Sequence, residues 1–196
     1  MKIIDGLRRD HELILEGLAL LAAMSDAIDK GMAQSSADLA GLLEFFAAFA
    51  DGQHHAKEEE MLFPALAEAG LPARGGPLMV MLAEHEEGRS YLQGLRALTG
   101  AGSLSSAAAR AAFVTVARQY RDLLVQHISK ENQVLFVMAE RLLKGREAML
   151  DEALSLREKA LPPEATFERW RARIDALQAG LRAQDARAAI APPPPA

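Results

Sequence analysis

The sequence of 196 residues contains no cysteine, and aromatic residues make up only 5% of it. The absence of cysteine excludes disulfide scaffolds, thiolate zinc sites, cysteine nucleophiles and cysteine-ligated clusters. Any metal must therefore be bound through nitrogen and oxygen atoms. The scarcity of aromatic residues, together with abundant Ala, Leu, Glu and Arg, favours helices over a sheet.

The chain also lacks a run of basic residues and a long apolar segment. Its net charge is −5, from 22 Lys and Arg against 27 Asp and Glu, so a nucleic-acid backbone has little to attract it. The apolar run 18–24 is much shorter than the roughly 20 residues that cross a bilayer. The opening MKIIDGLRRDHE reaches charged residues before a signal-peptide core could form. We therefore expect a soluble, cytoplasmic protein that binds neither nucleic acid nor a membrane.

Apolar residues recur at helical spacing through four long segments, and the breaks between these segments are rich in Gly, Ser and Pro. The predicted helices cover about residues 2–30, 36–69, 77–98 and 107–144. Short breaks force neighbouring helices to run antiparallel, so residues 1–145 are predicted to form an up-down-up-down four-helix bundle in an all-α fold. Pro64 is expected to bend the second helix.

Residues 146–191 are predicted to form an additional helical extension, interrupted at Pro162 and Pro163. The last helix carries a narrow apolar seam, which is expected to pack on the bundle or to form a homodimer, through Phe167, Trp170, Ile174, Leu177 and Leu181. The proline-rich residues 192–196 are expected to be an extended tail.

Four of the five histidines lie on the predicted inner faces of the four helices, namely His11, His55, His85 and His127. In an up-down bundle, residues on consecutive helices lie at the same height when they are equidistant from the connecting loop. The midpoints of the three consecutive pairs are residues 33, 70 and 106, and all three fall in predicted breaks. The four imidazoles are therefore predicted to meet at one level of the core.

Two of these histidines are followed four residues later by a glutamate on the same helical face, in the pairs His55–Glu59 and His127–Glu131. The remaining pair, His54 and Glu58, is expected to be a solvated surface pair, because consecutive helical residues point about 100° apart. Burying six such donors without partners is unfavourable, so a cation is the simplest explanation for the cluster. Four nitrogens and two bridging carboxylates suit two ions, with iron favoured and manganese or zinc as alternatives.

These residues resemble the hemerythrin-like HHE cation-binding domains, in their order, their spacing and the flanking sequences RRDHE, HHAKEEEMLFP, AEHEEG and HISKENQVLF. The resemblance covers residues 1–145 and implies a non-haem di-iron centre with an oxo or hydroxo bridge. It further implies that Glu59 and Glu131 bridge the ions and that the four histidines are terminal ligands. The pattern is similar to a four-histidine variant found in repair-of-iron-centres and mycobacterial hemerythrin-like proteins. Oxygen-carrying members have a further histidine where this sequence has Met81, which argues against reversible oxygen carriage.

Two more residues are candidates for contacts just outside the ligand set. Tyr120 lies two turns before His127 on the same face, so it could hydrogen-bond a ligand or pack as a core aromatic residue. Met81 lies one turn before His85 and is expected to fill the space of the missing histidine rather than to contact the metal weakly.

The leading functional hypothesis is a di-iron protein that binds or reacts with a small oxidant (O2 or peroxide) or with nitric oxide, in stress response, sensing or iron handling. One alternative is a di-iron enzyme that decomposes peroxide or reduces nitric oxide. Another is a helical interaction module in which the metal is structural.

Overall fold

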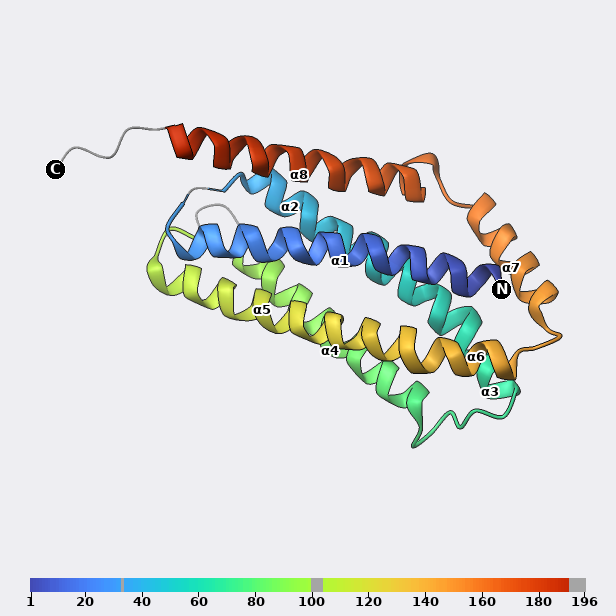
Figure 1. The fold of residues 1–196 in the computed structure, drawn as a ribbon. Helices are drawn as coiled ribbons and strands as arrows, with labels where there is room; N and C mark the ends of the chain where they lie inside the picture. Colours follow the sequence, from blue (N-terminus) through green and yellow to red (C-terminus); the bar gives the residue numbers. More distant parts are fainter. Residues whose placement is uncertain (33, 100–103, 191–196) are drawn as a thin grey trace.

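The computed structural model describes residues 1–32, 34–99 and 104–190, and every regular element in this part of the chain is a helix (Figure 1). Four rods form the predicted bundle. The first is α1 (Lys2–Asp29) and the third is α4 (Pro77–Leu98). The second rod consists of α2 (Ser36–Phe45), η1 (Phe46–His55), η2 (Glu58–Leu62) and α3 (Phe63–Glu68). The fourth consists of α5 (Ala107–Lys130), η3 (Glu131–Leu135) and α6 (Phe136–Leu142).

The breaks between the rods have the local chemistry that the sequence indicates. The hydroxyl oxygens of Ser35 and Ser106 accept hydrogen bonds from backbone N–H groups at the starts of α2 and α5, at 3.2 and 3.1 Å. Gly31 and Gly70 adopt positive φ angles of 72° and 100° just after the first and second rods, a conformation that ends helices and that glycine adopts without steric cost.

The second and fourth rods are not continuous α-helices, because η1, η2 and η3 are π-helical. A π-helix closes i→i+5 hydrogen bonds, each of which spans one residue more than in an α-helix, and this rotates the following side chains relative to an α-helix. Pro64 lies in the first turn of α3, directly after η2, where the missing N–H costs least. The periodicity of the sequence did not predict these π-helical segments.

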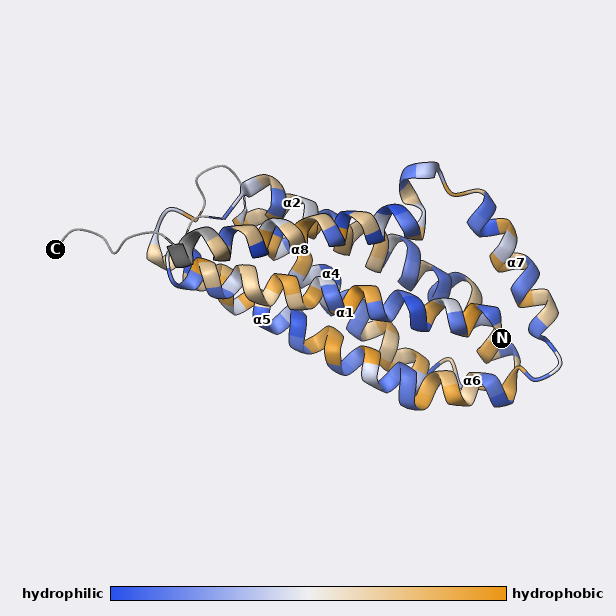
Figure 2. Cartoon of the chain, turned by 45° about the horizontal axis from the view of Figure 1, so that its top comes forward, coloured by the Kyte–Doolittle hydropathy of each residue, from blue (hydrophilic) through white to orange (hydrophobic). Residues whose placement is uncertain are grey.

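Two apolar clusters fill the bundle, one on each side of a polar layer. The larger cluster includes Phe45, Phe46 and Phe113, and the smaller one includes Leu7, Leu62 and Phe136. Hydrophilic and hydrophobic residues alternate along each rod, as expected of amphipathic helices (Figure 2). The polar layer between the clusters is thus enclosed by apolar side chains above and below.

The C-terminal extension consists of α7 (Glu147–Lys159), the short helix η4 (Pro163–Ala165) and α8 (Phe167–Ile190). Helix α8 runs alongside α1 and α2 (Figure 1). Trp170 and Ile174 are buried in the larger cluster, and the other three seam residues pack partly buried against it. The seam therefore packs on the bundle of its own chain. The predicted tail, residues 192–196, lies outside the described residues.

None of the helices in the described part of the chain is both long enough and apolar enough to span a membrane. The predicted division between a bundle of residues 1–145 and an extension stays a prediction.

Candidate metal centre

The polar layer of the bundle contains all five histidines and two glutamates, each almost fully buried: His11, His54, His55, Glu58, His85, His127 and Glu131. These side chains come from all four rods. They form two groups whose donor atoms lie within 4.8 Å of one another. We call them group A (His55, Glu58, His85 and His127) and group B (His11, His54, Glu58 and Glu131). Glu58 belongs to both groups.

The structure brings together five of the six predicted ligands, the exception being Glu59. It also corrects the interpretation of His54 and Glu58, which are not a solvated surface pair: they are 1% and 0% exposed. The π-helical segments explain the difference. They contain His54 and Glu58 and change the rotation per residue, so that consecutive histidines both point into the core, His54 toward His11 and His55 toward His85, with ring centroids 4.6 and 3.8 Å apart.

Glu59 lies at the edge of the layer, where its side chain is 25% exposed. Its Oε1 lies 2.7 Å from the Nδ1 of His85, on the side of the ring that faces away from the centre. Glu59 is thus placed to orient a ligand, whereas the resemblance assigned it a bridge between ions. The sequence signal for this difference is the repetition of His and Glu in HHAKEEE, because a neighbouring His or Glu can take the inward position expected for His55 or Glu59.

Of the two outer candidates, Tyr120 packs in the larger apolar cluster, edge-on to Phe46 at a centroid distance of 5.2 Å. Met81 packs in the smaller cluster. Both residues thus lie in packing positions, and a contact of either one with a bound ligand or metal stays a prediction.

The Nδ1 atom of every histidine faces an oxygen atom outside the centre. The partners are Asn132 for His11 (3.0 Å), Asp10 for His54 (3.5 Å), Asp51 for His55 (3.2 Å), Glu59 for His85 (2.7 Å) and Glu84 for His127 (2.9 Å). In four of these pairs the oxygen is close enough to accept a hydrogen bond from Nδ1–H, whereas the contact between His54 and Asp10 is too long for one. A proton on Nδ1 leaves Nε2 with its lone pair directed toward the centre. Metal-binding histidines typically have this arrangement.

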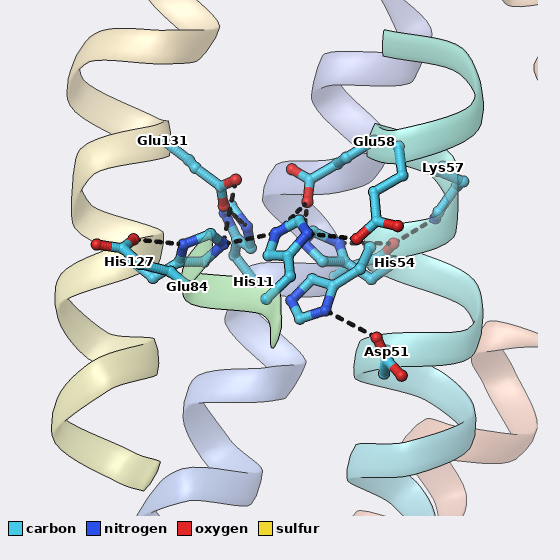
Figure 3. Close-up of polar contacts among 12 residues, drawn as sticks. His11, Asp51, His54, Lys57, Glu58, Glu84, His127 and Glu131 are labelled. Atoms are coloured by element: carbon cyan, nitrogen blue, oxygen red, sulfur yellow. Dashed lines mark hydrogen bonds and ion pairs between the residues drawn. The ribbon is translucent and has the colours of Figure 1, made fainter. Parts of the chain in front are cut away.

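Three cations hold the outer carboxylates in turn. Lys57 pairs with Asp10 and Lys130 pairs with Glu84, while Arg89 contacts both Asp51 and Glu59. Figure 3 shows the ion pair of Lys57 and the contact between Glu84 and His127. The sequence interpretation did not identify these outer residues.

The inward nitrogens of His85 and His127 lie so close together that they need a proton or a cation between them. In the metal-free protein, burial of His127 is outweighed by the charges of Glu131 and Glu84, which raise the pKa of His127. The Nε2 atoms of His85 and His127 lie 3.0 Å apart, and each ring already directs its Nδ1 to a carboxylate. Two lone pairs that face each other at this distance repel unless a positive charge lies between or beside them. Burial and the charges of neighbouring histidines lower the pKa of His85, and they lower that of His54 to about 3, so both rings stay neutral at physiological pH.

The inner carboxylates show the same shortage of partners. Neither oxygen of Glu58 or of Glu131 accepts a hydrogen bond from a described residue, although all four are buried. Both carboxylates reach toward the imidazoles from the same side (Figure 3). Burial and the nearby charge of Glu131 raise the pKa of Glu58 well above its usual range. For Glu131, burial acts in the same direction, but the charges of His127 and His11 outweigh it and lower the pKa.

Glu131 also connects the two groups, because its oxygens lie 3.1 Å from the Nε2 of His11 and 3.2 Å from the Nε2 of His127. The centre thus offers five imidazoles and two carboxylates that each contact both groups. Nitrogen and carboxylate donors without thiolate suit iron, manganese or zinc. The residues therefore fit a pair of metal ions, one in each group.

Comparison with known proteins agrees with this chemistry. Two iron-sulfur cluster repair proteins named YtfE are similar to the chain. The protein of Edwardsiella ictaluri is 32% identical over 141 residues, which is 70% of this chain and 62% of that protein. The protein of Musicola paradisiaca is 31% identical over 140 residues, which is 68% of this chain and 62% of that protein. The chain thus spans less than two thirds of the length of these relatives.

No solved structure matches the chain. The sequence model of the hemerythrin HHE cation binding domain matches residues 2–139, a range that contains every histidine and both inner glutamates. The chain therefore belongs to the hemerythrin HHE cation-binding domain family.

Proposed function

We propose that the chain binds two iron ions, one at group A and one at group B, with Glu58 and Glu131 bridging them. The observation that carries this proposal is the pair of opposed Nε2 atoms of His85 and His127, which lie 3.0 Å apart in a buried layer. The two buried carboxylates without hydrogen-bond donors support it independently. Manganese and zinc accept the same nitrogen and carboxylate donors and are the alternatives to iron.

The two groups offer different numbers of donors. Group A has three imidazoles and group B has two, while Glu58 and Glu131 contact both. An ion at group B would therefore keep more coordination positions for an external ligand. We infer that a small oxidant or nitric oxide binds on this side, near His11 and His54. The chemistry supplied by bound iron is the binding and reduction of such a ligand.

The surrounding residues prepare this site in three ways. The outer carboxylates fix the ring orientations, which keeps the Nε2 lone pairs directed inward. The two apolar clusters exclude water from above and below the layer. Within the centre, the low pKa values of His54 and His85 keep these rings available as donors even in mildly acidic solution.

The similar proteins are named for the repair of iron-sulfur clusters. A role in iron handling or stress response, inside the cell, is therefore our proposal for this chain as well. Because the chain spans 62% of the length of those relatives, this wider role rests on the shared metal domain alone.

Anaerobic reconstitution with ferrous iron tests the proposal. We expect two iron ions per chain and, after oxidation, the near-ultraviolet absorption of a bridged di-iron centre. Fewer than one iron per chain would refute it. Addition of nitric oxide to the reduced protein should give one spectroscopically distinct adduct per chain. Sustained oxygen evolution from added hydrogen peroxide would show that the centre turns over rather than only binds.

A further inference from the structure

Arg89 occupies a special position among the cations around the centre. It lies on α4, four residues after His85, and its guanidinium contacts carboxylates from two π-helical segments. Its Nε lies 2.8 Å from the Oδ1 of Asp51, and one terminal nitrogen lies 2.7 Å from the Oε1 of Glu59. The other terminal nitrogen contacts the exposed Glu86 at 2.6 Å.

The oxygens that Arg89 contacts are the same atoms that orient two imidazoles. Oδ1 of Asp51 is also 3.2 Å from the Nδ1 of His55, and Oε1 of Glu59 is also 2.7 Å from the Nδ1 of His85. These two rings are stacked, with centroids 3.8 Å apart and planes inclined by 12°. One guanidinium thus fixes the outer partners of two neighbouring ligands in group A.

The other outer carboxylates are arranged differently. Asp10 pairs with Lys57 and Glu84 pairs with Lys130, so each has a cation of its own. Lysine presents a compact charge, whereas the planar guanidinium presents donors in a fixed fork that can hold two carboxylates at defined angles. The charge of Arg89 is therefore shared between two ligand-orienting carboxylates.

This sharing has an electronic consequence for a bound ion. A carboxylate that accepts a hydrogen bond from Nδ1 raises the basicity of the imidazole, which stabilises the higher oxidation state of the metal. A cation on the same oxygen withdraws negative charge and weakens this effect. Removal of the positive charge of Arg89 should therefore increase the basicity of both imidazoles, His55 and His85.

We propose that Arg89 is a positioning residue that acts through Asp51 and Glu59 to raise the reduction potential of an iron ion held by His55 and His85. This inference rests on the proposed function, since it concerns the metal-loaded centre. The side chain of Arg89 is 32% exposed, and its ion pairs within the described part of the chain are with Asp51, Glu59 and Glu86, so the variant Arg89→Met leaves the donor atoms of groups A and B intact.

The test measures the reduction potential of the iron-loaded full chain by spectroelectrochemistry. For Arg89→Met we expect wild-type iron content and a more negative potential. A tenfold increase in the ratio of ferric to ferrous affinity would appear as a shift of about 59 mV for a one-electron step. Arg89→Lys keeps the charge and should recover most of the wild-type potential, although the lysine cannot hold both carboxylates in the same geometry.

Arg96→Met is the matched control, because Arg96 lies on the same helix and pairs with Glu44 on the surface, at 2.9 Å. Its potential should equal that of the wild type. The inference is overturned if Arg89→Met loads iron but has the potential of Arg96→Met or a more positive one. If Arg89→Met folds too poorly to be measured, the double variant Arg89→Lys with Glu59→Gln decides: an unchanged potential relative to Arg89→Lys overturns the inference. Failure of the wild type to bind iron would refute the proposed function together with this inference.

Discussion

Replacement of Glu58 by glutamine should change the stability of the protein in opposite directions with and without metal. In the metal-free protein, both carboxylate oxygens of Glu58 are buried without a hydrogen-bond donor. A buried polar group without a partner costs roughly 1–3 kcal/mol, and a charged one costs more. The amide is neutral without taking up a proton, and it supplies two donors toward the nearby Glu131. We therefore expect Glu58→Gln to stabilise the metal-free protein by about 1–3 kcal/mol.

This gain is measurable by thermal unfolding. For a chain of 150–250 residues, 1 kcal/mol corresponds to roughly 2–4 °C in Tm. With ferrous iron present, the wild type should be more stable than Glu58→Gln. A ligand at 1,000 times its Kd stabilises the folded state by about 4 kcal/mol. Glu58→Gln should lose most of this stabilisation by iron, because the substitution removes the carboxylate that is shared by groups A and B. Iron content should fall below two ions per chain.

The neighbouring glutamates provide matched controls, since Glu58, Glu59 and Glu60 follow one another in the same segment. Glu60 is 61% exposed and pairs with Arg157, so Glu60→Gln should change stability by no more than about 0.5 kcal/mol in either state. Glu59→Gln should retain iron and lower stability with or without metal, because Glu59 contacts His85 and Arg89. Loss of iron in Glu59→Gln but not in Glu58→Gln would refute the assignment, as would destabilisation of the metal-free protein by Glu58→Gln.

Two further predictions concern pH and the C-terminal helix. Because the pKa of Glu58 is raised in the folded metal-free protein, its contribution to stability is complete below the ordinary pKa of 4.5 and is lost as the pH rises through the folded value. Urea unfolding of metal-free protein should therefore show the advantage of Glu58→Gln over the wild type growing from pH 5 to pH 8, and a constant difference would contradict this. Trp170→Ala should cost roughly 3–5 kcal/mol, because the ring is 4% exposed and packs against Phe45 and Phe49. Its iron content should stay at the wild-type value, and parallel loss of iron in a metal assay would show that α8 supports the centre directly.

The bundle was predictable because its signals are local and repeated. Apolar periodicity marked the four rods, and Ser35, Ser106 and the glycines marked their ends. The level of the centre was also predictable, since the spacing of His11, His55, His85 and His127 depends only on rod length and antiparallel order. All four imidazoles lie in one buried layer.

Which glutamate of the second rod is buried in the polar layer was not predictable in this way. The prediction of Glu59 assumed a rotation of 100° per residue, which holds for an α-helix but not for η1 and η2. The free-energy difference between an α-turn and a π-turn is decided by tertiary contacts. Here the π-helical geometry allows His54 and His55 to enter the core side by side, and an amphipathic pattern in the sequence carries no sign of it.

The charges around the centre explain why the layer favours a cation. Six carboxylates belong to it, four outside the imidazoles and two inside, whereas the described contacts supply three cationic partners: Lys57, Arg89 and Lys130. Counted with ionised carboxylates and neutral imidazoles, the layer carries three excess negative charges, and burial together with the charge of Glu131 raises the pKa of Glu58. One divalent ion leaves this excess at one negative charge, and a second ion converts it to one positive charge. A centre with a single excess positive charge and open positions at group B attracts a small anion or a ligand that becomes anionic on reduction. The outer cations thus help to determine the charge of the ligand that the loaded centre accepts.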